Sequence, residues 1–180
     1  VEIMNKGFSL LETTVAIAIL TVAILGPLSV ATFALSNAGR SENEIIAYNL
    51  AEEALEFVIN VRDSNVFAGD TWLLGLELGG NKCDGINGCY IDVTDTANPV
   101  KDCTGSCSGD LIRRNTTSGL YNHQSVAADN IDTIFRRRVF LRDNNLINND
   151  ERIVEVRITW NERFLPNKSF IIEHHIFEKE

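Results

Sequence analysis

Residues 8–35 read FSLLETTVAIAILTVAILGPLSVATFAL, and Glu12 is the one charged residue in this stretch. The part from Val15 to Leu35 holds 21 residues without a charge. An α-helix rises about 1.5 Å per residue, so these residues would span about 31 Å, enough to cross the hydrocarbon core of a bilayer. The sequence therefore predicts a helix that anchors the chain in a membrane.

The flanks of this stretch indicate a retained anchor that crosses the membrane once. The apolar run is longer than the core of a secretory signal peptide, and no A-x-A-like cleavage site follows it. Lys6 precedes the run and Arg40 follows it, which gives a weak preference for a cytoplasmic N-terminal end. Charge counting alone does not decide on which side of the membrane the later residues lie.

The bulk composition argues against a general affinity for nucleic acid. The chain has 180 residues, a formal net charge of -9 and a hydrophobic fraction of 44%. Phosphate backbones attract clustered positive charge, which this balance does not supply. The length suits one modest domain beside the anchor.

The residues around the start of the apolar run form a recognisable motif. Lys6-Gly7 is followed by Phe8-Ser9-Leu10-Leu11-Glu12 and then by an apolar helix that contains Gly26-Pro27. This motif resembles the N-terminus of the type IV pilin family, in which prepilin peptidase cuts a leader after the glycine and the new first residue is methylated. The resemblance implies a leader at 1–7, or 4–7 if Met4 is the true start, with cleavage between Gly7 and Phe8.

The resemblance also implies a structural role. The stretch AYNLAEEALEFVINVRDSN at 47–65 looks like minor pilins of the V type and I-type pseudopilins of type II secretion. The implied partners are the membrane, prepilin peptidase, other pilin subunits and an inner-membrane assembly platform. The subunit would lie in the cytoplasmic membrane before assembly, and in a periplasmic or cell-surface filament afterwards. Pilus, secretion and competence systems share this helix, so the system stays open.

Glu12 is the residue to which the resemblance gives an assembly role. A charge inside a membrane helix costs a few kcal/mol, which makes it a functional candidate by default. In pilins the matching glutamate is thought to pair with the N-terminal amine of a neighbouring subunit, here that of Phe8, and would thereby set the axial register. The alternative is a residue near the interface, since Glu12 lies only about 6 Å of helix rise from Phe8.

Gly26-Pro27 is the expected place for a kink or a locally melted turn, because proline lacks a backbone N–H and crowds the preceding turn. The alternative, weighted equally, is a proline that the membrane helix tolerates.

Residues 36–62 predict an amphipathic continuation of the helix. At helical spacing one face carries the residues Ile46, Ala47, Leu50, Ala51, Ala54, Phe57, Val58 and Val61. The acidic residues Glu52, Glu53 and Glu56 lie outside that face, and we interpret them as solvated. The sequence therefore predicts a helix over 8–62, apolar to residue 35 and then packed on a core by one side.

The remaining residues, 63–180, predict a globular domain with a small antiparallel sheet. Residues 63–130 are rich in Gly, Asn and Asp and read as loops, apart from a short strand at 90–93. Strands at 133–141, 151–160 and 169–177 read as a meander within 133–178. Their expected inward residues are Phe135, Val139, Leu141, Val154, Val156, Ile158, Trp160, Phe170, Ile172 and Ile176. Helix and sheet together make a pilin-like α+β fold.

Four cysteines lie within the loop at 83–107. If the domain faces an oxidising compartment, the short separations favour disulfides Cys83–Cys89 and Cys103–Cys107 among the three pairings allowed. Zinc is the alternative, although the spacings differ from the usual C-x-x-C.

No other pattern predicts catalysis. His123 stands alone in a loop, and His174 and His175 would point to opposite faces of a strand. Catalytic motifs are missing from the sequence, so we expect no enzymatic activity, cofactor or metal. Asp143 to Asp150 is oxygen-rich, yet it lacks the glycine and glutamate of a calcium loop, which favours a hairpin turn.

Arg136-Arg137-Arg138 raises the alternative function of a membrane-anchored or filament-tip binding module, for DNA uptake, adhesion or capture of a secreted substrate. In a strand the three arginines would divide between two faces, so a solvated face is favoured over a nucleic-acid site, which stays open.

Overall fold

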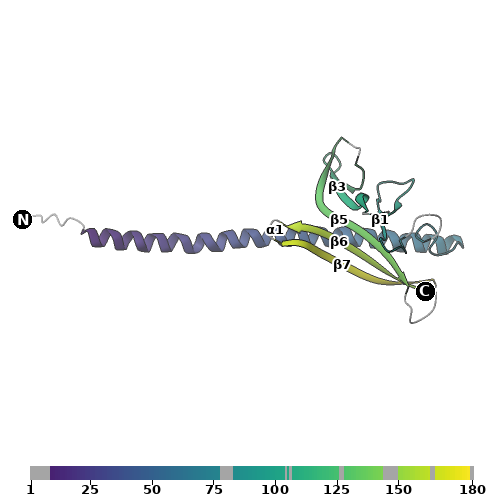
Figure 1. The fold of residues 1–180 in the computed structure, drawn as a ribbon, viewed down its shortest axis with the longest axis horizontal. Helices are drawn as coiled ribbons and strands as arrows, with labels where there is room; N and C mark the ends of the chain where they lie inside the picture. Colours follow the sequence, from purple (N-terminus) through teal and green to yellow (C-terminus); the bar gives the residue numbers. More distant parts are fainter. Residues whose placement is uncertain are drawn as a thin grey trace, which may run out of the picture. The chain divides into compact units, whose positions relative to one another are not determined.

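The structure is a computed structural model that describes residues 9–77, 83–103, 105, 107–125, 128–143, 150–162 and 165–178 (Figure 1). The chain divides into two compact units, Val1–Asn43 and Glu44–Glu180. One helix, α1, runs from Leu10 to Ala68 and contributes to both units. All strands belong to the second unit.

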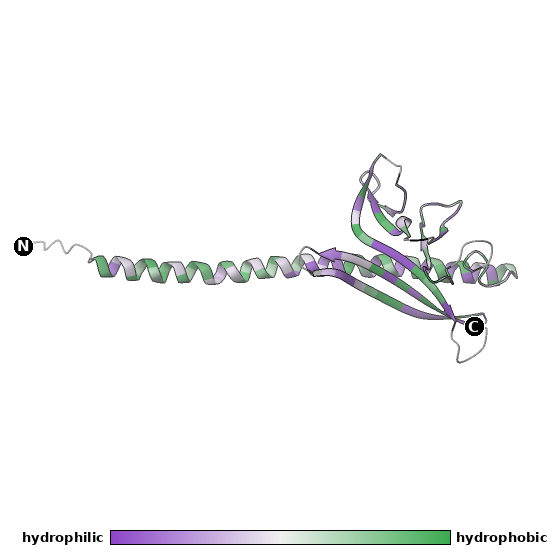
Figure 2. Cartoon of the chain, in the orientation of Figure 1, coloured by the Kyte–Doolittle hydropathy of each residue, from purple (hydrophilic) through white to green (hydrophobic). Residues whose placement is uncertain are grey.

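The first unit contains the apolar part of α1. Its large apolar side chains are all exposed, from Leu10 at 83% to Leu35 at 74%. Figure 2 shows the hydrophobic colouring of this segment. Within the described residues, α1 is the one helix long and apolar enough to cross a membrane, which fits the predicted single-pass anchor.

The second part of α1 packs on the sheet by one face, as predicted. Ala47, Leu50, Ala51, Ala54 and Val58 are buried in the main core cluster. These residues recur at helical spacing, so one face of the helix lies against the sheet and the other stays outside the core.

The helix ends at Ala68, six residues beyond the predicted end at residue 62. Gly69 has a positive φ of 78° and donates its N–H to the carbonyl of Val66, while Asp70 donates to Asn65. These two bonds form a Schellman cap, which satisfies the last carbonyls of the helix. The polar residues 63–65, interpreted as the start of a loop, instead lie within the helix.

The sheet has seven antiparallel strands, so the predicted α+β class is confirmed. The strands and the 3-10 helix are β1 (Cys89–Ile91), β2 (Val100–Asp102), η1 (Ser108–Asp110), β3 (Leu111–Asn115), β4 (Tyr121–Asn122), β5 (Asn130–Asp143), β6 (Glu151–Glu162) and β7 (Leu165–Phe177). The predicted meander corresponds to β5, β6 and β7. The strand predicted at 90–93 is β1.

The prediction of continuous loops between β1 and residue 130 was wrong, because β2, β3 and β4 lie there with η1. These strands have two to five residues each and are flanked by turn-forming residues. Strand β2 pairs with β1, and β4 pairs with β3, each across a short connection, whereas β3 also pairs with β5 further along the chain. Local propensity carries little of that information.

Strand β5 is the branch point of the sheet. Its residues 135–143 pair with β6, and Val139 also pairs with Cys89 of β1. Its first residues pair with β3, and the register shifts between Leu111 and Arg113. This β-bulge bends β5, and Figure 1 shows the strand curving away from β6 and β7 toward β3.

The inner face of the sheet follows the predicted alternation. In register across three strands, Val139 lies beside Val156 and Val156 beside Ile172. Phe135, Leu141, Ile158 and Trp160 are buried in the same core, so the predicted inward face is confirmed.

Candidate assembly site and disulfide-linked loops

Glu12 lies in the first turn of α1, at the third helical position. Ser9 precedes the helix, and its Oγ accepts a hydrogen bond of 3.3 Å from the backbone N–H of Glu12. The spacing S-x-x-E is that of a capping box, in which the serine and glutamate satisfy free N–H groups at a helix start. Ser9 therefore caps the helix start, and Glu12 occupies the glutamate position of the capping-box spacing, which the sequence interpretation missed.

Polar groups elsewhere in the apolar part of α1 are satisfied within the helix. The hydroxyls of Thr13, Thr14, Thr21, Ser29 and Thr32 each donate to the carbonyl three residues earlier, at 2.8–2.9 Å. Such bonds remove the cost of placing a hydroxyl in hydrocarbon. Hence Glu12 is the one side chain between Leu10 and Leu35 that demands an outside partner or water.

Pro27 lies inside α1, and the helix is unbroken at Gly26-Pro27. Proline offers no N–H to the carbonyl of Ala23, so that oxygen lacks its usual donor. The Oγ of Ser29 donates to the carbonyl of Gly26 at 2.8 Å and reinforces the helix at this point. No melted turn is present here, and the kink stays a prediction. The predicted processing residues, Gly7 and Phe8, lie outside the described residues.

Both predicted disulfides are confirmed: Cys83 is bonded to Cys89, and Cys103 to Cys107. The first is fully buried and tied to the sheet, because the N–H of Leu141 donates to the carbonyl of Cys83 at 2.8 Å. Beside it, Gly88 has φ 67°, and a Cβ there would lie 2.4 Å from the carbonyl oxygen of Val139. Only glycine fits this approach.

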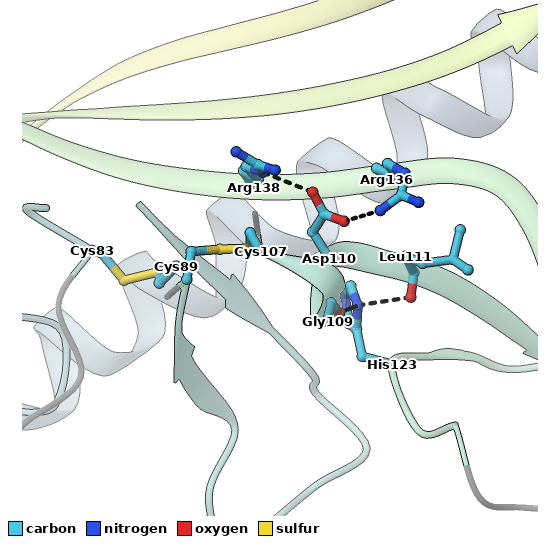
Figure 3. The surroundings of a disulfide bond; sticks show 10 residues. Cys83, Cys89, Cys107, Gly109, Asp110, Leu111, His123, Arg136 and Arg138 are labelled. Carbon is cyan, nitrogen blue, oxygen red and sulfur yellow. Dashed lines mark hydrogen bonds and ion pairs between the residues drawn. A yellow bond between two sulfur atoms is a disulfide. The ribbon is translucent and has the colours of Figure 1, made fainter. Parts of the chain in front are cut away.

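The second disulfide ends beside η1, which positions Asp110 over the sheet (Figure 3). The buried carboxylate of Asp110 binds Arg136 Nη1 at 2.5 Å and Arg138 Nε at 2.7 Å. The two arginines alternate on β5 and share the outer face of the sheet. One buried acid therefore compensates two of the three arginines of the predicted basic run.

Arg137 lies on the opposite face of β5 and is fully buried. Its guanidinium donates to the carbonyls of Leu50 at 2.8 Å and Ile91 at 2.7 Å, and lies 3.4 Å from Glu53. Burial lowers the pKa of Arg137, and the charge of Glu53 opposes that effect. This side chain joins α1, β1 and β5. The basic run thus divides between two faces as predicted and leaves no row of solvated cations.

His123 was predicted to stand alone, and this prediction was wrong. The ring is buried, and its Nδ1 lies 2.9 Å from the carbonyl oxygen of Gly109 and 3.1 Å from that of Leu111 (Figure 3). The backbone N–H of His123 donates to Asp92. Carbonyls only accept, so Nδ1 carries the proton. Burial, followed by the charge of Arg137, lowers the pKa of His123 to about 4. The loops that carry these partners meet only in the fold, so sequence spacing could not reveal them.

The described residues hold no cluster of three or more His, Cys, Asp or Glu side chains suited to a metal ion. The four cysteines, for which zinc was the alternative, are engaged in disulfides. His175 binds Glu151 at 2.5 Å, whereas His174 lies one residue along the strand and is exposed. Most of the candidate calcium segment, 144–149, lies outside the described residues.

Comparisons of the chain with protein families, with curated proteins and with solved structures return no match.

Proposed function

We propose that the chain is a structural subunit of a type IV pilin-like filament, as a minor pilin or a type II secretion pseudopilin. Prepilin peptidase cuts between Gly7 and Phe8. The helix holds the subunit in the cytoplasmic membrane with the following residues outside, and the assembly platform moves it into a filament. The subunit works by packing against other pilin subunits and carries out no catalysis.

One observation carries the proposal: a single carboxylate, Glu12, in the first turn of a helix that is otherwise apolar and exposed over residues 10–35. Exposed apolar side chains on all sides of a helix require lipid or other helices around them. Among helices and away from water, an unpaired carboxylate is expensive, and a neighbour's N-terminal ammonium is a suitable partner.

The capping-box position of Glu12 makes a sharp test possible. Glutamine replaces glutamate in a capping box, so Glu12→Gln keeps the helix start and removes only the charge. We expect this variant to insert into membranes at the wild-type level and to be lost from sheared filament fractions. Immunoblots of membranes and filaments measure both. Glu56→Gln, which removes an exposed glutamate from the second part of α1, is the matched control and should assemble normally.

Normal assembly of Glu12→Gln would refute charge pairing. Processing is tested separately by mass spectrometry of the mature N-terminus. The proposal expects a chain that begins at Phe8 and carries one added methyl group. An N-terminus that keeps Gly7 would refute processing by prepilin peptidase.

A second candidate function is the membrane-anchored binding module. The observation that favours it is a cleft in the second unit, at the place where β5 bends away from β6.

A further inference from the structure

The bend in β5 opens a cleft of about 340 Å³ between three strands. Pairing of β5 with β6 stops at Phe135 and Trp160, and the next residues, Ile134 and Asn161, line the cleft. Arg136, Thr159, Trp160, Asn167 and Lys168 complete its walls. The cleft is therefore a fork in the sheet, created by the β-bulge.

The walls of the cleft are positively charged. Arg136 and Lys168 line it, and none of its described lining residues is a carboxylate. Arg136 binds Asp110, yet about half of its side chain, 48%, remains exposed. Within the described residues, no ion pair engages Lys168. The amides of Asn161 and Asn167 add neutral hydrogen-bonding groups beside these cations.

One wall of the cleft continues into an open strand edge. Among the described residues, no strand pairs with 130–134 of β5 on the side that faces β6. Ile131 and Ile134 lie along this segment and are about half exposed, at 52% and 47%. An open edge with exposed apolar residues is a template for an added strand.

We propose that the cleft binds an extended peptide segment that presents a carboxylate. The peptide backbone pairs with residues 130–134 of β5, and its carboxylate binds Lys168, the lining cation that no ion pair engages within the described residues. Either a free C-terminus or an Asp or Glu side chain supplies this group. A peptide fits better than nucleic acid because the site combines an open backbone edge with a single uncompensated lysine, whereas nucleic acid needs a cluster of positive charge.

The probe is a fluorescein-labelled hexapeptide with the sequence Val-Thr-Val-Thr-Glu-Glu. It is titrated against the full chain in detergent micelles, with fluorescence anisotropy as the readout. Two derivatives separate the sources of the carboxylate: one has an amidated C-terminus, and the other has glutamines in place of the glutamates. We expect a Kd on the order of 10–100 µM, weakened in at least one derivative.

Lys168→Gln should weaken binding about tenfold, because it removes one charged donor from the site. Lys101→Gln, which removes the same charge from β2, is the matched control and should bind as the wild type does. Equal loss in the two variants would overturn the proposal. So would no binding up to millimolar concentration, or displacement of the probe by a single-stranded DNA oligonucleotide at low salt but not by unlabelled peptide.

Hydrogen exchange followed by mass spectrometry locates the peptide. The proposal expects slower exchange in 130–134 and no change in 169–177 of β7, whose outer edge also has no strand partner among the described residues. Protection of β7 instead would overturn it. These results are independent of filament assembly, because the test of Glu12 changes the first turn of α1 and leaves the cleft intact.

Discussion

At the scale of single residues, the domain buries several charged or titratable groups and gives each a partner. Asp110 is held by two arginines, Arg137 by two carbonyls and a carboxylate, and His123 by two carbonyls. Buried polar groups without partners would cost several kcal/mol, so each network restricts how the loops can be placed. Their locations follow from tertiary contacts, which explains why the sequence predicted Cys83–Cys89 and not the surroundings of His123.

His123 makes the stability of the domain depend on pH. Its pKa is about 4 in the folded chain against 6.5 in its ordinary state, so the unfolded chain takes up a proton first as the pH falls. Stability is therefore lost between about pH 6.5 and pH 4, by up to about 3 kcal/mol. His123→Gln does not titrate, and denaturant unfolding in micelles should show a weaker pH dependence over this range. An unchanged slope would contradict the assignment.

Arg137 and Arg142 offer a matched pair of arginine deletions on one strand. Arg137→Ala leaves two carbonyls and Glu53 without their cation in the core and should lower the free energy of unfolding by about 3–5 kcal/mol. Arg142 is half exposed, and its partner Glu155 also binds Arg157. Arg142→Ala should therefore cost about 1 kcal/mol or less. Equal losses in thermal or denaturant unfolding would show that Arg137 does not join the helix to the sheet.

At the scale of elements, β5 determines the architecture because it changes partners along its length. The alternation of apolar and polar residues along β5, β6 and β7 could be recognised in the sequence, and the predicted inward residues are confirmed. The bulge could not be predicted from the sequence, because it depends on the register of β5 against β3. The end of α1 could have been predicted, because Gly69 follows its last residue. The polar residues 63–65 were instead interpreted as the start of a loop, although they lie on an exposed face of the helix.

Thr133 stabilises the bulge. Its hydroxyl donates to the carbonyl of Ile112 at 2.6 Å and accepts from the N–H of Phe135 at 3.2 Å, which replaces bonds that the irregular register leaves open. Thr133→Val should lower the free energy of unfolding by about 1–3 kcal/mol, because both backbone groups lose their partner. Thr133→Ser keeps the hydroxyl and should cost less than about 1 kcal/mol. Similar losses in the two variants would show that the methyl group, and not the hydroxyl, matters.

At the scale of the whole molecule, one helix serves two environments. Ile24 and Ile45 are equally exposed, at 61% each, although the first lies in the uncharged part of α1 and the second beside Glu44. The exposed fraction therefore does not distinguish Ile24 from Ile45. The difference comes from the lipid expected around residues 10–35, and the sequence predicted this division because charge is absent from one part.

A pair of lysine substitutions tests whether residues 10–35 of α1, and not the later part of the helix, lie in a membrane. Ile24→Lys places a charge near the middle of the apolar part and should oppose insertion by about 3 kcal/mol, which reduces the fraction of chain that resists alkaline extraction from membranes. Ile45→Lys adds the same charge outside that part and should extract as the wild type does. Equal behaviour of the two variants would contradict a membrane span over residues 10–35.

The internally bonded hydroxyls of α1 have a consequence for how the helix exchanges its surroundings. Because Thr13, Thr14, Thr21, Ser29 and Thr32 already donate within the helix, replacing lipid neighbours by protein neighbours breaks no hydrogen bond. In the proposed assembly, lateral transfer out of the bilayer would therefore break no side-chain hydrogen bond at these positions, in either direction. Glu12 alone would have a lower free energy among neighbouring subunits than in lipid, because only there would it meet an N-terminal amine. This difference would favour transfer from the bilayer into the filament.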